Sequence, residues 1–169
     1  MTSGRFVPLA TVTTAVVSST LLMLGPACHE GGTLDCGDAC APVEGNYPLA
    51  FQDDAGLPAE CVNLDVQAVA SGERLSIQPA ADGGILTGTL TGVALTGQVY
   101  PSGNLSLNGT PLPSSDGGLS TFLNVNATFT GGPDDAGSLS GTFTGNYSRI
   151  QGTSALRCTV TRPFTATRQ

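Results

Sequence analysis

The stretch Leu123-Asn124-Val125-Asn126-Ala127-Thr128-Phe129 alternates strictly between apolar and polar side chains. Alternation with a period of two places every apolar side chain on one face of a β-strand, and it is typical of a strand that buries one face. The same alternation recurs along most of the chain, so this stretch indicates the kind of element from which the domain is built.

Further short strands with one apolar face precede and follow this stretch. Turn residues such as Gly83-Gly84 and Asn108-Gly109 separate them at short intervals, which is typical of successive antiparallel strands. We expect strands at residues 45–51, 61–69, 75–77, 85–90, 93–99, 105–107, 123–129, 139–147 and 156–164. We expect no helix between them.

Successive hairpins that each have one apolar face must curl in order to bury that face. The sequence therefore predicts an all-β domain at residues 43–169, an antiparallel meander of about eight to ten strands that closes into a barrel. A two-sheet β-sandwich is the alternative. Four glycines have inward parity, as sharply bent barrel strands require; they are Gly88, Gly97, Gly141 and Gly145.

The first 27 residues have the parts of an export signal. Arg5 is followed by an uncharged, largely apolar run to Leu24, and small residues then precede Cys28; this order is typical of a secretory signal that is removed. Residues 28–42 show no periodic apolar pattern and predict a flexible tether.

The residues that end this segment, Leu24-Gly25-Pro26-Ala27-Cys28, resemble the signal of bacterial lipoproteins, in which a leucine and small residues precede a cysteine that becomes diacylated. The resemblance implies lipidation of Cys28 and attachment to a membrane of the cell envelope. Gly25 and Ala27 also satisfy the small-x-small rule of ordinary signal peptidase, which would give a secreted soluble protein with the same first residue.

The five cysteines predict disulfides if the protein is exported. Lipidation of Cys28 would leave four cysteines and three possible connectivities. We favour Cys61–Cys158, which joins an early strand to the last strand, together with Cys36–Cys40 in the tether. A metal site at Cys36 and Cys40 is the alternative, but it needs more soft ligands, and the single histidine is His29.

The composition argues against two classes of function. The formal net charge is −7 and the chain contains no lysine, so the basic surface that binds a nucleic-acid backbone is missing. The single histidine lies in the tether, so the domain lacks the usual general base. We expect no enzymatic activity, no cofactor and no nucleic-acid partner.

Gly45-Asn46-Tyr47 on the first strand is similar to the Gly-x-Trp start of lipocalin-like barrels. In that family an aromatic ring plugs one end of the barrel, and a basic residue near the last strand packs over it. The resemblance implies that Tyr47 and Arg162 close one end of this barrel through a cation–π contact.

Two roles then remain for an exported, lipid-anchored barrel. One is a binding module that holds a small apolar ligand inside the barrel. The other is a structural or protein-interaction module whose interior is filled by its own side chains.

Overall fold

The computed structural model describes residues 40–53, 56–80, 84–110, 118–132 and 136–169. The predicted export signal, Cys28 and Cys36 lie outside the described residues. The strands are β1 (Gly45–Pro48), β2 (Ala50–Phe51), β3 (Arg74–Pro79), β4 (Ile85–Leu90), β5 (Val93–Val99), β6 (Asn104–Gly109), β7 (Ser120–Thr130), β8 (Ser138–Gln151) and β9 (Ser154–Thr167), with one short helix, α1 (Ala59–Val62).

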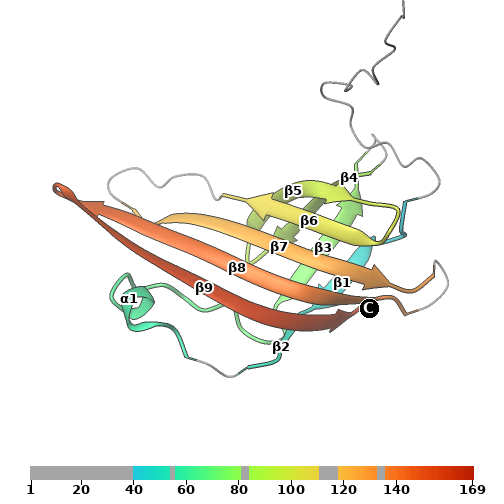
Figure 1. Ribbon diagram of the computed structural model, residues 1–169, viewed down its shortest axis with the longest axis horizontal. Coiled ribbons are helices and arrows are strands. Elements are labelled where there is room, and N and C mark those ends of the chain that lie inside the picture. Colours follow the sequence, from blue (N-terminus) through green and yellow to red (C-terminus); the bar gives the residue numbers. More distant parts are fainter. Residues whose placement is uncertain (1–39, 54–55, 81–83, 111–117, 133–135) are drawn as a thin grey trace, which may run out of the picture. The chain divides into compact units, whose positions relative to one another are not determined.

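These nine strands form one antiparallel sheet that is nearly closed into a barrel (Figure 1). The strand order is β1-β3-β4-β5-β6-β7-β8-β9-β2, so neighbours in the sheet are neighbours in the chain from β3 to β9. This confirms the predicted meander and barrel and excludes the β-sandwich.

The closure comes from the first strand segment, which meets both edges of the meander. β1 pairs with β3, and β2, one residue further on, pairs with β9. Two backbone hydrogen bonds extend the second pairing in both directions: Gln169 donates to the Asn46 carbonyl at 3.0 Å, and Gln52 donates to the Pro163 carbonyl at 3.1 Å. Closing a barrel in this way leaves few unpaired strand edges.

The inward-facing positions form one apolar core. The largest fully buried side chains include Tyr47, Phe143 and Phe164, and the described residues contain no buried polar or charged side chain apart from the tyrosine hydroxyls. The alternation that predicted the strands therefore also identified the core, from Leu75 in β3 to Phe164 in β9.

Glycine at position 97 permits a close approach of two strands. A Cβ atom there would lie 1.7 Å from the Ser106 carbonyl oxygen on β6. This distance is too short for any residue other than glycine. The prediction that inward glycines allow strands to bend is consistent with this contact.

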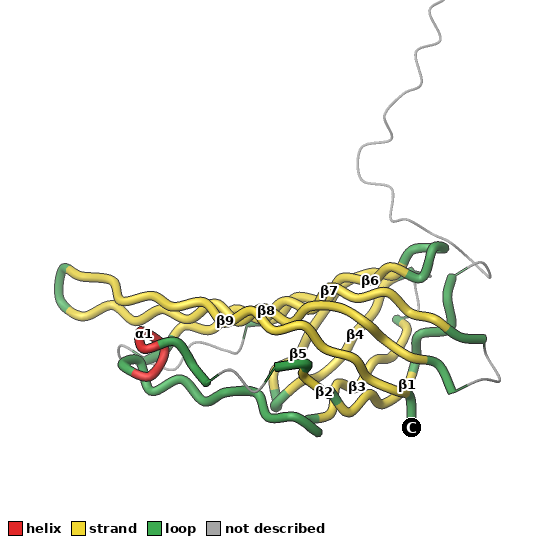
Figure 2. Tube along the Cα trace, turned by 60° about the horizontal axis from the view of Figure 1, so that its bottom comes forward, coloured by secondary structure: helices red, strands yellow, loops and turns green. Residues whose placement is uncertain are grey.

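Three strands continue beyond the rest of the barrel at one end. β8 and β9 pair along their whole length to Gln151 and Ser154, whereas the pairing of β6 with β7 stops at Leu123. Figures 1 and 2 show the resulting β8–β9 hairpin projecting past the other strands. We call residues 146–159 of this hairpin, with residues 120–122 of β7, the arm.

The prediction of a strand at residues 61–69 is wrong. Residues 59–62 form α1, in which Cys61 and Val62 donate to the Pro58 carbonyl, and Asp65 has a positive φ of 56° that ends the turn. Val62 and Ala68, expected to face inward, are exposed, whereas Leu64 and Val66 are buried. Pro58 is the N-cap residue of α1, where its missing N–H breaks no helical hydrogen bond. Period-two spacing also arises in an extended coil that packs on a core.

Candidate functional site

The barrel has two different ends. At the proximal end, Val43 leads into β1 and β9 finishes. At the distal end lie the β4–β5 turn and the arm, and Figure 1 shows the C-terminus at the opposite end from the tip of the arm. Each end holds an arginine that lies over an aromatic ring.

Arg168 organises the proximal end. Its guanidinium donates to the carbonyls of Pro42 at 2.9 Å and Gly132 at 3.0 Å, and it lies 5.6 Å from the ring centroid of Phe129. These contacts tie the start of the domain to the β7–β8 connection. The Tyr47 hydroxyl lies in the same region and donates to the Val43 carbonyl at 2.9 Å.

Burial is the main influence on Tyr47. Desolvation raises the pKa of its phenol above the ordinary value, and the charge and hydrogen bond of Arg168 offset only part of that rise; Glu44 raises the pKa further. The phenol is therefore neutral and serves as a hydrogen-bond donor inside the barrel.

Arg162 organises the distal end, and its partner differs from the expected one. Its guanidinium lies 3.9 Å from the ring centroid of Phe51, and it donates to the Asp53 carboxylate at 3.2 Å and to the Val69 carbonyl at 3.0 Å. The predicted contact of Arg162 with Tyr47 is thus replaced by a contact with Phe51.

The strand register explains this correction. Phe51 pairs with Phe164, and the Asn46–Gln169 hydrogen bond continues the same register. This register places Arg168, not Arg162, opposite Tyr47. Arg168 has the same parity as Arg162 and lies six positions later in the chain, which was the signal that the sequence analysis missed.

A cap covers the distal end; we define it as residues 56–69, between β2 and β3. The disulfide Cys61–Cys158, with a Cα–Cα distance of 5.3 Å, joins it to β9 as predicted, although Cys61 lies on α1 and not on a strand. Arg149 of the arm donates to the Leu64 carbonyl at 3.3 Å and lies 4.0 Å from the Asp65 carboxylate.

The other predicted disulfide is only partly visible. Cys40 is disulfide-bonded, and its partner lies outside the described residues. The Cys36–Cys40 pair therefore stays a prediction, and so does the lipidation of Cys28.

A pocket of about 330 Å³ lies between the cap and the barrel, and we call it the distal pocket. Gln67, Ala68 and Val69 of the cap form one side. The barrel contributes Thr91, Val93, Leu119, Thr121, Leu123 and Tyr147. Burial raises the pKa of the Tyr147 phenol, so this side chain is also a neutral donor.

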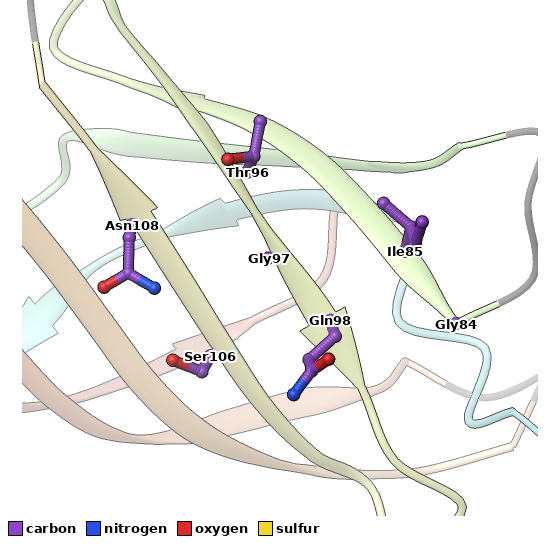
Figure 3. A pocket seen from close by; sticks show the side chains of 7 residues that line it. All are labelled: Gly84, Ile85, Thr96, Gly97, Gln98, Ser106 and Asn108. Carbon is purple, nitrogen blue, oxygen red and sulfur yellow. The ribbon is translucent and has the colours of Figure 1, made fainter. Parts of the chain in front are cut away.

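A second hollow, of about 430 Å³, lies on the outside of the sheet over β4, β5 and β6 (Figure 3). Its polar side chains are uncharged: Thr96, Gln98, Ser106 and Asn108. Asn108 continues into a hydrogen-bonded row, because its amide oxygen accepts from Asn124 at 2.7 Å and Asn124 accepts from Asn126 at 2.5 Å. These hydrogen bonds pair polar side chains on the outer face of a chain that has few charges.

The remaining chemistry of the described residues is sparse. Within them, no three histidine, cysteine or carboxylate side chains come close enough to share a metal ion. The same part of the chain has no helix with the length and hydropathy of a membrane span. The sequence matches no known protein-family model and no curated protein.

Proposed function

We propose that the chain is an exported, lipid-anchored and non-enzymatic protein-interaction domain that presents the distal end of its barrel to a partner protein. The observation that carries this proposal is the position of the exposed apolar side chains. In the described residues, the large ones that are exposed are Val62, Phe122, Ile150 and Leu156, and all four belong to the arm or to α1 in the cap.

Ile150 and Leu156 lie near the tip of the projecting hairpin, where exposed side chains of this size gain nothing in an isolated domain. Ile150 is 73% exposed, and its cross-strand neighbour is Ala155, which offers little cover. Leu156 shares the parity of Cys158, which faces the cap, whereas Ile150 lies on the other face of the hairpin. A partner that covers both would enclose the arm, and exposed apolar groups that gather in one region are typical of a surface that another protein covers.

The place where the tether joins the domain leaves the arm accessible. It would join the domain at the proximal end, through Val43, whereas the arm lies at the distal end. A lipid on Cys28 would therefore be attached at the end of the domain that does not carry the arm, so the attachment itself would not cover the arm.

The filled core favours this role over ligand storage inside the barrel. Tyr47, Phe143 and Phe164 occupy the interior with at most 1% exposure. Small barrels filled in this way act as scaffolds for their loops and edges.

The anchor can be tested by metabolic labelling with a palmitate analogue. We expect label on the mature chain and none on the Cys28→Ser variant. A wild-type chain that carries no label would reject the lipid and leave a secreted domain.

The arm can be tested by placing a photocrosslinking amino acid at Ile150 in the exporting cells. We expect one discrete crosslinked product, and we expect it to weaken when Phe122 and Leu156 are changed to Ser. The same crosslinker at Thr96, on the outer face away from the arm, is the control. Equal products from both positions, or none from Ile150, would contradict the proposal.

A second candidate function, binding of a small apolar ligand, is favoured by one observation. The distal pocket has apolar walls, and it lies at the mouth of the barrel rather than inside the filled core.

A further inference from the structure

We propose that the distal pocket binds a small neutral amphiphile, with an apolar body against Val69, Val93 and Leu123 and a hydrogen-bond acceptor on the Tyr147 hydroxyl. The inference gives the second candidate function a site and a ligand class. It does not depend on the protein-interaction role of the arm.

Tyr147 is the residue on which the inference depends. The residue is only 7% exposed, and none of the described residues forms a hydrogen bond with its hydroxyl. Since the described residues contain no fully buried side-chain oxygen that lacks a partner, this hydroxyl reaches solvent. A ligand that brings an acceptor into the pocket can therefore take the place of water at this donor.

The surroundings of Tyr147 hold its ring in one place. Its neighbours across the sheet are Thr121 on β7 and Cys158 on β9, and Cys158 carries the disulfide to the cap. A Cβ atom on Gly145 would lie 2.5 Å from the Tyr147 hydroxyl oxygen, so the ring occupies space that only glycine leaves open. A donor that is already positioned loses little entropy when a ligand binds.

The walls and the charges of the pocket define the ligand class. Val69, Val93 and Leu123 are buried apolar side chains, and the one charged residue of the lining is Asp65. Arg149 already pairs with Asp65, and the lining holds no cation that could bind the charge of a carboxylate ligand. A volume of about 330 Å³ suits a small molecule that has a ketone, ester, ether or amide oxygen.

The cap controls access to this site. It supplies Gln67, Ala68 and Val69 to the lining, and the disulfide of Cys61, the contacts of Arg149 with Leu64 and Asp65, and the hydrogen bond from Arg162 to Val69 hold it in place. A fixed cap gives the pocket a formed shape before the ligand arrives.

The test uses the unlipidated Cys28→Ser chain and the neutral ketone dye prodan, whose emission shifts to the blue in apolar surroundings. The chain has no tryptophan, so the dye is observed without that background. We expect saturable binding, and we expect Tyr147→Phe to weaken it about three- to ten-fold, the effect of one neutral hydrogen bond.

Three controls separate the pocket from other sites. Tyr100→Phe removes a hydroxyl elsewhere and should leave the affinity unchanged, and a dye analogue without the carbonyl should bind wild type and Tyr147→Phe equally. Ala68→Phe places a ring at an exposed lining position and should abolish binding without loss of folding. Prodan binding that is absent, that is unaffected by Tyr147→Phe, or that is unaffected by Ala68→Phe would overturn the inference. Crosslinking at Ile150 would be unaffected by that result.

Discussion

The guanidinium of Arg162 lies 3.9 Å from the ring centroid of Phe51 and donates to the Val69 carbonyl at 3.0 Å. One side chain thus joins the strand that closes the barrel to the cap that covers its distal end. Its contact with the Asp53 carboxylate adds a charge-assisted hydrogen bond, and the Arg162 side chain is only 13% exposed, so these bonds are partly shielded from water.

Arg162→Met should lower the free energy of unfolding by about 2 kcal/mol, because it keeps the apolar stem but leaves the Val69 carbonyl without its donor. Arg162→Lys should recover only part of the loss, since an ammonium cannot stack on Phe51 and bond both the Val69 carbonyl and the Asp53 carboxylate at once. Urea denaturation measures both values. Arg157→Met, an exposed position on the same strand, is the control and should change the stability by less than about 0.5 kcal/mol. An equal loss at both positions would show that the contacts of Arg162 are unimportant.

The disulfide Cys61–Cys158 closes a loop with a sequence separation of 97. Cys61→Ala with Cys158→Ala should lower the free energy of unfolding by up to about 4–5 kcal/mol, because the unfolded chain regains the entropy that the crosslink removes. Denaturation with and without reductant measures the effect. Reductant should destabilise the wild type and leave the double variant almost unchanged; a double variant as stable as the oxidised wild type would contradict this expectation.

Gly97→Ala should destabilise the barrel by at least about 3 kcal/mol, the upper range for overpacking. The added methyl would overlap the Ser106 carbonyl, so β5 and β6 would have to separate. Gly56→Ala is a matched control, because nothing lies within 4 Å of the position of its Cβ. Thermal unfolding should distinguish the two variants clearly, and similar midpoints would mean that the barrel adjusts without cost.

Most of the barrel could be predicted because each strand is specified by the alternation of its own apolar and polar side chains, which is a local pattern. The strands from β3 to β9 follow from alternation between turn residues, and inward parity identified buried residues as far apart as Ile77 and Val160. Alternation fails where a strand leaves the core, since Leu156 has inward parity but lies in the arm, where it is 40% exposed.

The parts that the sequence did not predict depend on contacts between distant residues. Alternation at residues 61–69 could not distinguish a strand from a coil packed over a barrel mouth, because both bury every second side chain. Likewise, the partners of Arg162 and Arg168 depend on the register between the first and last strands. That register is set by pairing across the closure, and no local pattern contains it.

The buried tyrosines should make the protein lose stability in alkali. Burial raises the pKa of Tyr47 and of Tyr147 above the ordinary tyrosine value of 10.0, whereas the unfolded chain ionises near that value. Below this pH both states hold the proton and the stability is fully present. As the pH rises through and beyond it, the unfolded state loses protons first, so the free energy of unfolding falls by up to about 1.4 kcal/mol per pH unit for each tyrosine. The chain has no lysine to titrate in the same range.

Urea denaturation at a series of alkaline pH values should show this slope in the wild type, a smaller slope in Tyr147→Phe and the smallest in the variant that also carries Tyr47→Phe. Equal slopes in all three proteins would show that neither buried phenol is linked to folding.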